Sequence, residues 1–175
     1  MKAIVVTDQA AGTAGMTLVE RPEPPAAIND AVVEVHASGF VPTEMEWPST
    51  WTDRVDRDRT PSILGHELAG VVTTLGYGTT GVSVGQRVFG LSDWHRDGTL
   101  AEYVAIEARN LAPLPGDVDF TVGASLPISG LPRGCNGISR CLPPLPSVTI
   151  SMAGSAPVTT SSARSCATSH ARRPA

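Results

Sequence analysis

The stretch GHELAGVV at residues 65–72 decides the fold class that the sequence predicts. It lies within a longer apolar segment, residues 63–75, which Gly65 and Gly70 interrupt. A buried apolar run of this kind, divided by glycines, is typical of β-structure rather than of a long helix. Its polar residues, His66 and Glu67, are interpreted as a strand start with hydrogen bonds to nearby loops.

Further short strands are expected on both sides of this stretch. The chain holds 17 Gly and 15 Pro in 175 residues, which favours short strands joined by turns. The expected strands are residues 3–6, 16–19, 31–35, 87–90, 100–106 and 111–114. This spacing predicts a mainly β fold, either a small barrel or a sandwich. The charged run at residues 52–59 is expected to form a solvated loop or a short helix.

The composition changes abruptly near residue 131. Residues 1–131 carry all 17 acidic and all eight aromatic residues and a net charge of −9. Residues 132–175 carry no acidic or aromatic residue, have a net charge of +5 and hold all three cysteines. Such a segment cannot bury much apolar area, so we expect a domain at 1–131 and a low-complexity, disordered tail at 132–175. A reading-frame shift near the Pro132 codon would explain the change; a natural tail or a sequencing artefact would do so as well.

Several classes of protein are excluded by the sequence. No run of about 18 apolar residues exists, so no membrane span is expected. The N-terminus lacks the apolar core of a secretion signal, which predicts a cytoplasmic protein. The mild net acidity, −4 overall, argues against a nucleic-acid partner.

Two motifs resemble ligand-binding patterns but are interpreted as structural. GYGTTG at residues 76–81 matches a nucleotide-binding glycine pattern, but no amphipathic helix can follow it, so a strand-to-strand turn is expected. His66 and Glu67 would be metal ligands only in a zinc-dependent enzyme, which needs three protein ligands, and no cysteine precedes Cys135. His36 is expected to be structural. Cys135, Cys141 and Cys166 match no zinc spacing and are interpreted as incidental.

Four segments resemble, in the right order, motifs of the medium-chain dehydrogenases/reductases. They are GHELAGVV (65–72), VSVGQRV (82–88), DGTLAEYV (97–104) and ASLPISGL (124–131). The resemblance covers residues 1–131 and implies a GroES-like domain, a partly open β-barrel. In this family a Rossmann domain follows.

The resemblance is closest to the zinc-free quinone oxidoreductase-like branch. Within SGFVPTE at residues 38–44, Val41 stands where zinc-dependent members have a cysteine ligand, and the four-cysteine lobe expected near residues 90–98 is absent. This branch implies an NAD(P)H-dependent oxidoreductase that transfers hydride from NADPH to a quinone or an activated double bond, with no zinc. Relatives often carry Asn at the position of Val41, so that polar contact does not carry over.

The resemblance also implies a site, although it assigns no catalytic residue. The side chains expected near the cleft for a small-molecule substrate are Phe40, Thr43, Glu44, Trp47 and Trp51. Those expected near the cofactor are Pro127, Ser129 and Gly130. Aromatic walls suit a flat conjugated substrate, with core packing as the alternative role of the two tryptophans.

The cofactor-binding half of this family is not found in the sequence. After Leu131 no second glycine-rich loop followed by a helix appears, so the Rossmann domain is missing or truncated. We therefore expect the chain by itself to be inactive, while the parent protein is an oxidoreductase for which a homodimer is considered. Two alternatives stay open: a non-catalytic GroES-like module that docks on a partner, and a zinc-dependent alcohol dehydrogenase.

Overall fold

The computed structural model describes residues 1–129 and 148–151. Two antiparallel β-sheets make up most of this part of the chain. The strands are β1 (Lys2–Val6), β2 (Thr17–Glu20), β3 (Asp30–Phe40), β4 (Ser62–Ile63), β5 (Glu67–Leu75), β6 (Arg87–Leu91), β7 (Tyr103–Glu107), β8 (Leu111–Pro113) and β9 (Val148–Ser151). The helices are α1 (Pro48–Trp51), α2 (Phe120–Ala124) and the 3-10 turns η1 (Gly12–Gly15), η2 (Pro42–Glu46) and η3 (Ala108–Asn110).

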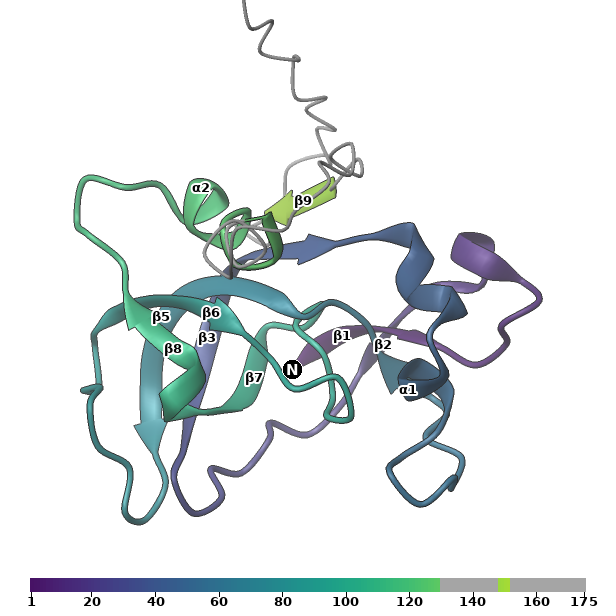
Figure 1. The fold of residues 1–175 in the computed structure, drawn as a ribbon, viewed down its shortest axis with the longest axis horizontal. Coiled ribbons are helices and arrows are strands. Elements are labelled where there is room, and N and C mark those ends of the chain that lie inside the picture. Colours follow the sequence, from purple (N-terminus) through teal and green to yellow (C-terminus); the bar gives the residue numbers. More distant parts are fainter. Residues whose placement is uncertain (130–147, 152–175) are drawn as a thin grey trace, which may run out of the picture.

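The larger sheet is built around β3. Its strand order is β7-β3-β5-β6-β8, with β9 also paired to β3, as Figure 1 shows. Alternating apolar residues of β3 and β5 face one side, where Val33, Leu68 and Val72 are buried with Val88 and Ile106. This alternation follows from the two-residue period of a strand. The resulting cluster is the main hydrophobic core.

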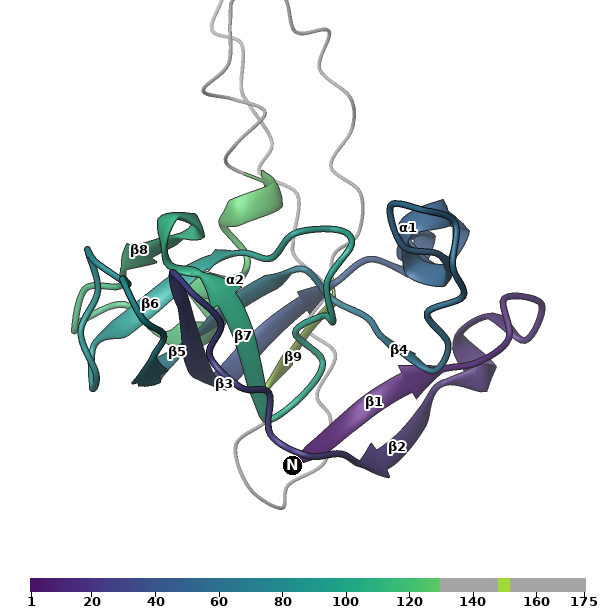
Figure 2. The same cartoon turned by 90° about the horizontal axis from the view of Figure 1, so that it is seen from below.

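The smaller sheet, in the order β2-β1-β4, lies beside the larger one (Figure 2). Its core packs Val5 and Ile63 against Phe40, Leu64 and Leu100. The two sheets are joined where Ile4 N–H donates to the Leu100 carbonyl at 2.8 Å. The chain passes from the small sheet to the large one between β4 and β5, at residues 64–66.

The structure confirms the predicted mainly β, GroES-like fold. All the expected strands are present, and the apolar segment 63–75 is divided into β4 and β5. The two sheets stay open, because neither closes into a barrel among the described residues. The loop at residues 76–81 joins β5 to β6, as predicted, and Gly78 and Gly81 have φ of +79° and +87°. No helix in the described part of the chain is long and apolar enough to cross a membrane.

The C-terminal part of the described domain is attached to the large sheet by α2. His36 stacks on Phe120 at 4.4 Å between ring centroids, in agreement with a structural role for this histidine. The guanidinium of Arg87 lies 4.1 Å from the same ring. Ala124 is buried with Ala37 and Ala69 of the sheet. These contacts fix the position from which the chain continues to residues 125–129.

One short strand comes from the segment for which the composition predicts disorder. β9 pairs antiparallel with β3, with Ser38 opposite Ile150. The rest of that segment, and with it Gly130, the three cysteines and the predicted boundary at residue 131, lies outside the described residues. The division into two domains therefore stays a prediction.

The pairing of β3 with β5 depends on the absence of a side chain at Gly70. A Cβ there would lie 2.0 Å from the Glu34 carbonyl oxygen and 2.8 Å from Val33 Cγ1. We expect Gly70→Ala to lower the free energy of unfolding by about 2 kcal/mol or more, because the overpacked strands must separate. Gly116→Ala is the matched control, since a Cβ at Gly116 meets nothing within 4 Å. Urea unfolding of both variants measures the difference; equal stabilities would contradict this packing.

Candidate functional site

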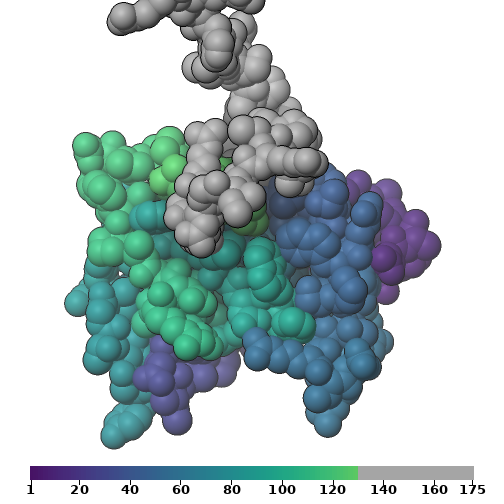
Figure 3. Space-filling model, in the orientation of Figure 1, coloured from purple at the N-terminus to yellow at the C-terminus, as the bar shows by residue number. Residues whose placement is uncertain are grey.

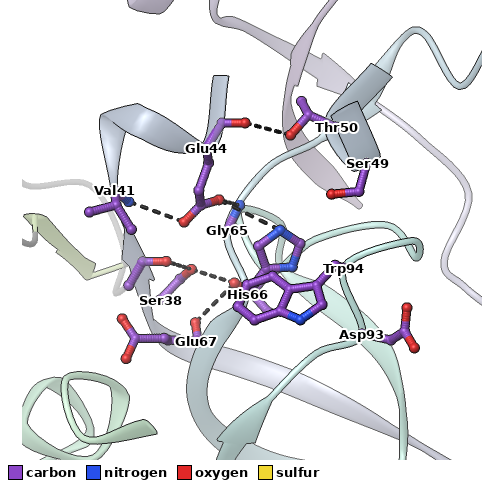
Figure 4. Close-up of polar contacts among 12 residues, drawn as sticks. Ser38, Val41, Glu44, Ser49, Thr50, Gly65, His66, Glu67, Asp93 and Trp94 are labelled. Carbon is purple, nitrogen blue, oxygen red and sulfur yellow. Dashed lines mark hydrogen bonds and ion pairs between the residues drawn. The ribbon is translucent and has the colours of Figure 1, made fainter. Parts of the chain in front are cut away.

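A buried carboxylate, that of Glu44, lies at the centre of the site. Pro42 begins the 3-10 turn η2 directly after β3, and Glu44 follows in its first turn. Its side chain is 0% exposed and accepts hydrogen bonds from the backbone N–H of Val41 at 3.1 Å and of Gly65 at 2.9 Å. Figure 4 shows the carboxylate between these two segments and next to His66. Glu44 thus joins the end of β3 to the turn between β4 and β5.

His66 lies between this carboxylate and two indole rings. Its Nε2 is 3.8 Å from Glu44 Oε2. Trp47 stacks on the imidazole at 5.7 Å between centroids, and Trp94 meets it edge-on at 4.5 Å. The other ring nitrogen, Nδ1, is buried and has no hydrogen-bond partner among the described residues. A buried polar atom without a partner is costly, so the hydrogen-bonding capacity of this nitrogen is unmet among the described residues.

Burial changes the charge of both groups. Desolvation raises the pKa of Glu44 to about 7, against the opposing effect of the two backbone N–H donors. Desolvation, together with the positive charge of Arg59, lowers the pKa of His66 to about 4. At neutral pH the imidazole is uncharged and Glu44 is partly protonated. The pair of Glu44 and His66 therefore carries at most a partial negative charge, and Arg59 and Asp93 are the charged groups that act on the imidazole.

The loop after β6 covers His66. In Figure 3 the blue surface around residues 40–60 adjoins the teal surface of the segment near residues 90–100. Arg59 connects the two by donating to the carbonyls of Ser49 and Trp94. Arg54 pairs with Asp93 at 2.6 Å. Trp94 itself is 37% exposed and also packs edge-on against Trp47 at 5.0 Å between ring centroids, so it covers the solvent side of this aromatic cluster.

Glu67 lies on the other side of the chain from His66. Figure 4 shows its carboxylate pointing away from the imidazole. Its Oε1 accepts the backbone N–H of Ile128 at 2.7 Å. Its backbone carbonyl accepts the hydroxyl of Thr99 at 2.9 Å, and Thr99 is in turn 2.7 Å from the hydroxyl of Ser38. Glu67 is the first residue of β5 and bonds to neighbouring segments, as the sequence analysis expects.

The structure brings together only part of the substrate-cleft set predicted from the sequence. Glu44 and Trp47 contact His66, and Thr43 lies beside them on η2. Phe40 is buried in the core of the small sheet. Trp51 packs against the same core, and its ring N–H donates to the Met45 carbonyl at 2.9 Å. Core packing thus accounts for Phe40 and Trp51. A role of the five predicted residues in a substrate cleft stays a prediction.

The predicted cofactor residues lie at the end of the described domain. Pro127 is buried and Ser129 is exposed, on either side of Ile128. Gly130 lies outside the described residues. Their role near a cofactor stays a prediction.

Two functional candidates are missed by the sequence analysis. Trp94 contacts His66 from the loop after β6, and Arg59 donates to the Trp94 carbonyl and acts on His66 through its charge. Arg59 is hidden in a charged run that is typical of a solvated surface. Trp94 is one of only three tryptophans in the chain, and this rarity is the one signal that could have drawn attention to it.

The residues of the site do not fit a catalytic zinc ion. Such an ion needs three protein ligands. Val41 has no donor atom in its side chain, and Glu67 is bonded to Ile128 rather than directed at His66. In residues 1–129 and 148–151 no three His, Cys, Asp or Glu side chains lie close enough to share a metal ion. A zinc site built from these residues would lack a ligand.

Two open antiparallel sheets with a polar turn between β4 and β5 define the class: a GroES-like β domain of the dehydrogenase type. Residues 27–116 match the family described as the alcohol dehydrogenase GroES-like domain, and the chain belongs to this family.

Several relatives of the chain are named as dehydrogenases or oxidoreductases. An L-threonine 3-dehydrogenase of Ruegeria pomeroyi is 29% identical over 139 residues, which are 64% of this chain and 40% of the relative. The solved quinone oxidoreductase of Coxiella burnetii is 27% identical with a TM-score of 0.64, covering 75% of this chain and 42% of that one. An alcohol dehydrogenase superfamily protein of Novosphingobium aromaticivorans is 30% identical with a TM-score of 0.62, covering 73% and 38%. The chain spans about two fifths of the length of these relatives.

The raised pKa of Glu44 predicts a particular pH dependence of stability. Between pH 4.5 and about 7 the folded chain holds a proton that the unfolded chain has lost. The contribution of Glu44 is therefore greatest below pH 4.5 and is lost as the pH rises through 7. We expect the stability difference between wild type and Glu44→Gln to fall by on the order of 3 kcal/mol over this window.

This difference isolates Glu44 from His66. The lowered pKa of His66 has the opposite effect, because between about pH 4 and 6.5 only the unfolded chain is protonated there. Denaturant unfolding at half-unit pH steps measures the profile of each protein. Glu46→Gln, an exposed carboxyl on the same turn, is the control and should follow wild type. A constant difference between wild type and Glu44→Gln would contradict a raised pKa.

Proposed function

We propose that the chain forms the substrate-binding half of an NAD(P)H-dependent reductase that acts, without zinc, on a flat conjugated carbonyl compound such as a quinone or an enone. The observation that carries the proposal is His66, held between Trp47 and Trp94 with an unpartnered Nδ1. The solved quinone oxidoreductases among the structural relatives support the same substrate class.

The chemistry of the pocket suits this class. Indole rings stack on planar conjugated rings. An uncharged imidazole offers a hydrogen bond to a carbonyl oxygen without attracting a charged substrate. Glu44 lies on the opposite side of His66, with Oε2 at 3.8 Å from Nε2. A bound nicotinamide would supply the hydride; the residues described here would bind and orient the acceptor.

Zinc-independence forms part of this proposal. A zinc enzyme of this family would bind its substrate oxygen through the metal. Here the position expected for a cysteine ligand is Val41, whose side chain is buried and aliphatic. The hydrogen bond from His66 would take the place of the metal as the group that polarises the carbonyl.

A second candidate is a dehydrogenase of an amino-acid alcohol. The observation in its favour is the similarity to the L-threonine 3-dehydrogenase of Ruegeria pomeroyi over 64% of this chain. L-Threonine is small, charged and not planar. It therefore gains little from two indole walls, and it serves as the opposing ligand in the test.

We predict that menadione, a flat quinone, quenches the tryptophan fluorescence of the chain in a saturable manner and that L-threonine does not. Trp94→Ala should weaken menadione binding by about five- to tenfold, because one stacked ring contributes roughly 1 kcal/mol. Tyr77→Ala is the matched control: it removes an exposed aromatic ring from the loop between β5 and β6 and should leave the affinity unchanged.

The outcomes separate the candidates. Saturable binding of L-threonine, together with one zinc per chain after dialysis, would replace the proposal by the second candidate. Menadione binding that is equal in wild type and in Trp94→Ala would remove the pocket around His66 from the proposal.

A separate prediction concerns the cofactor. The described residues contain no strand, glycine-rich loop and helix in succession that could hold a pyrophosphate. We predict that this 175-residue chain by itself shows no saturable NADPH binding and no reductase activity. Isothermal calorimetry measures this, and a submicromolar dissociation constant would contradict it.

A further inference from the structure

The carboxylate of Glu67 is buried at the end of the large sheet and accepts one hydrogen bond from among the residues that the structure describes. In the strand register Glu67 lies opposite Gly39 of β3 and opposite Leu91 of β6. A Cβ at residue 39 would be 2.3 Å from Glu67 Oε2, so the carboxylate fills the space that the glycine leaves. The backbone of Glu67 is held as well, through its carbonyl bonded to Thr99. The side chain thus has little freedom to point elsewhere.

The partner of this fixed carboxylate is a backbone N–H far along the chain. Glu67 Oε1 lies 2.7 Å from the nitrogen of Ile128, 61 residues away. Burying a carboxylate is costly, and desolvation raises the pKa of Glu67 accordingly. A single hydrogen bond to the backbone offsets only part of that cost. An apolar side chain at residue 67 would serve packing alone at a lower cost.

Apolar packing does not by itself direct the chain at residue 128. α2 is fixed by Ala124 against Ala37 and Ala69. After its last backbone bonds, from Ser125 to Val122 and from Leu126 to Gly123, the chain leaves α2 and enters a further helical turn at residues 127–129. The bond to Glu67 is directional, and it fixes the backbone between Pro127 and Ser129.

We propose that Glu67 is a positioning residue that fixes the backbone of residues 127–129, the segment through which the chain leads from this domain toward the nucleotide-binding half. The inference rests on the proposed function, because the segment matters only if a cofactor binds next to it. It assigns Glu67 to the crossover rather than to a metal, and it gives Gly39 the role of making room for the carboxylate.

The first test is made on the unaltered chain. The amide of Ile128 should exchange with solvent at least tenfold more slowly than its intrinsic rate. Isotope-labelled protein should also show a coupling through the hydrogen bond between the Ile128 nitrogen and the Glu67 carboxyl carbon. Exchange at the intrinsic rate, with no such coupling, would overturn the proposal whether or not any variant folds.

Variants then assign the effect to the carboxylate. Glu67→Ala should speed exchange of the Ile128 amide at least tenfold while the Leu126 amide, bonded to Gly123, keeps its rate. Glu67→Gln retains an oxygen acceptor and should restore most of the protection, which a role in packing alone would not require. Glu46→Ala, the removal of an exposed carboxyl, is the matched control. Unchanged exchange in folded Glu67→Ala, or no rescue by Gln, would overturn the proposal.

The result can be read apart from the proposed function. If menadione does not bind but the Ile128 amide is protected, the proposed substrate class is wrong and the contact between Glu67 and Ile128 is still supported. An unprotected Ile128 amide with intact menadione binding would remove the role of Glu67 alone.

Discussion

The site depends on one buried carboxylate that joins two segments through their backbone. Glu44 accepts the N–H of Val41, at the end of β3, and of Gly65, in the turn between the two sheets. Without this acceptor both donors would be buried without a partner, which is costly. The bond to Gly65 also sets where the next residue, His66, enters the pocket. A contact that serves backbone architecture therefore determines the geometry of the candidate site.

The same burial determines the electrostatics of the pocket. Desolvation moves the pKa of Glu44 up and that of His66 down, so near neutral pH the imidazole is uncharged and the carboxyl is only partly ionised. Ion pairing at this pair is therefore weak. What remains is stacking on Trp47 and Trp94 and one hydrogen bond from the imidazole. The proposed function rests on this combination, which would favour planar, uncharged acceptors.

The sequence predicts the local elements well and the long-range contacts poorly. The strands follow from apolar runs and turns, and the loop at residues 76–81 is correctly assigned because no helix follows its glycines. The motifs also bring out Glu44 and Trp47. Trp94 and Arg59 are missed, because their approach to His66 depends on how the loop after β6 folds over η2 and α1. No periodicity encodes such a contact, and the bond between Glu67 and Ile128 spans 61 residues with no signal in either segment.

Three consecutive residues at the start of the segment 65–72 have different roles in the site. Gly65 has φ of +84°, and a Cβ there would lie 2.7 Å from Thr99 Oγ1, so only glycine allows the sharp turn between the sheets. The N–H of Gly65 donates to the Glu44 carboxylate. The imidazole of His66 contacts Trp47 and Trp94. The side chain of Glu67 points to the opposite side and accepts the N–H of Ile128. The turn is where the two sheets meet, so neighbouring residues contact the indole of Trp94 on one side and the backbone of Ile128 on the other.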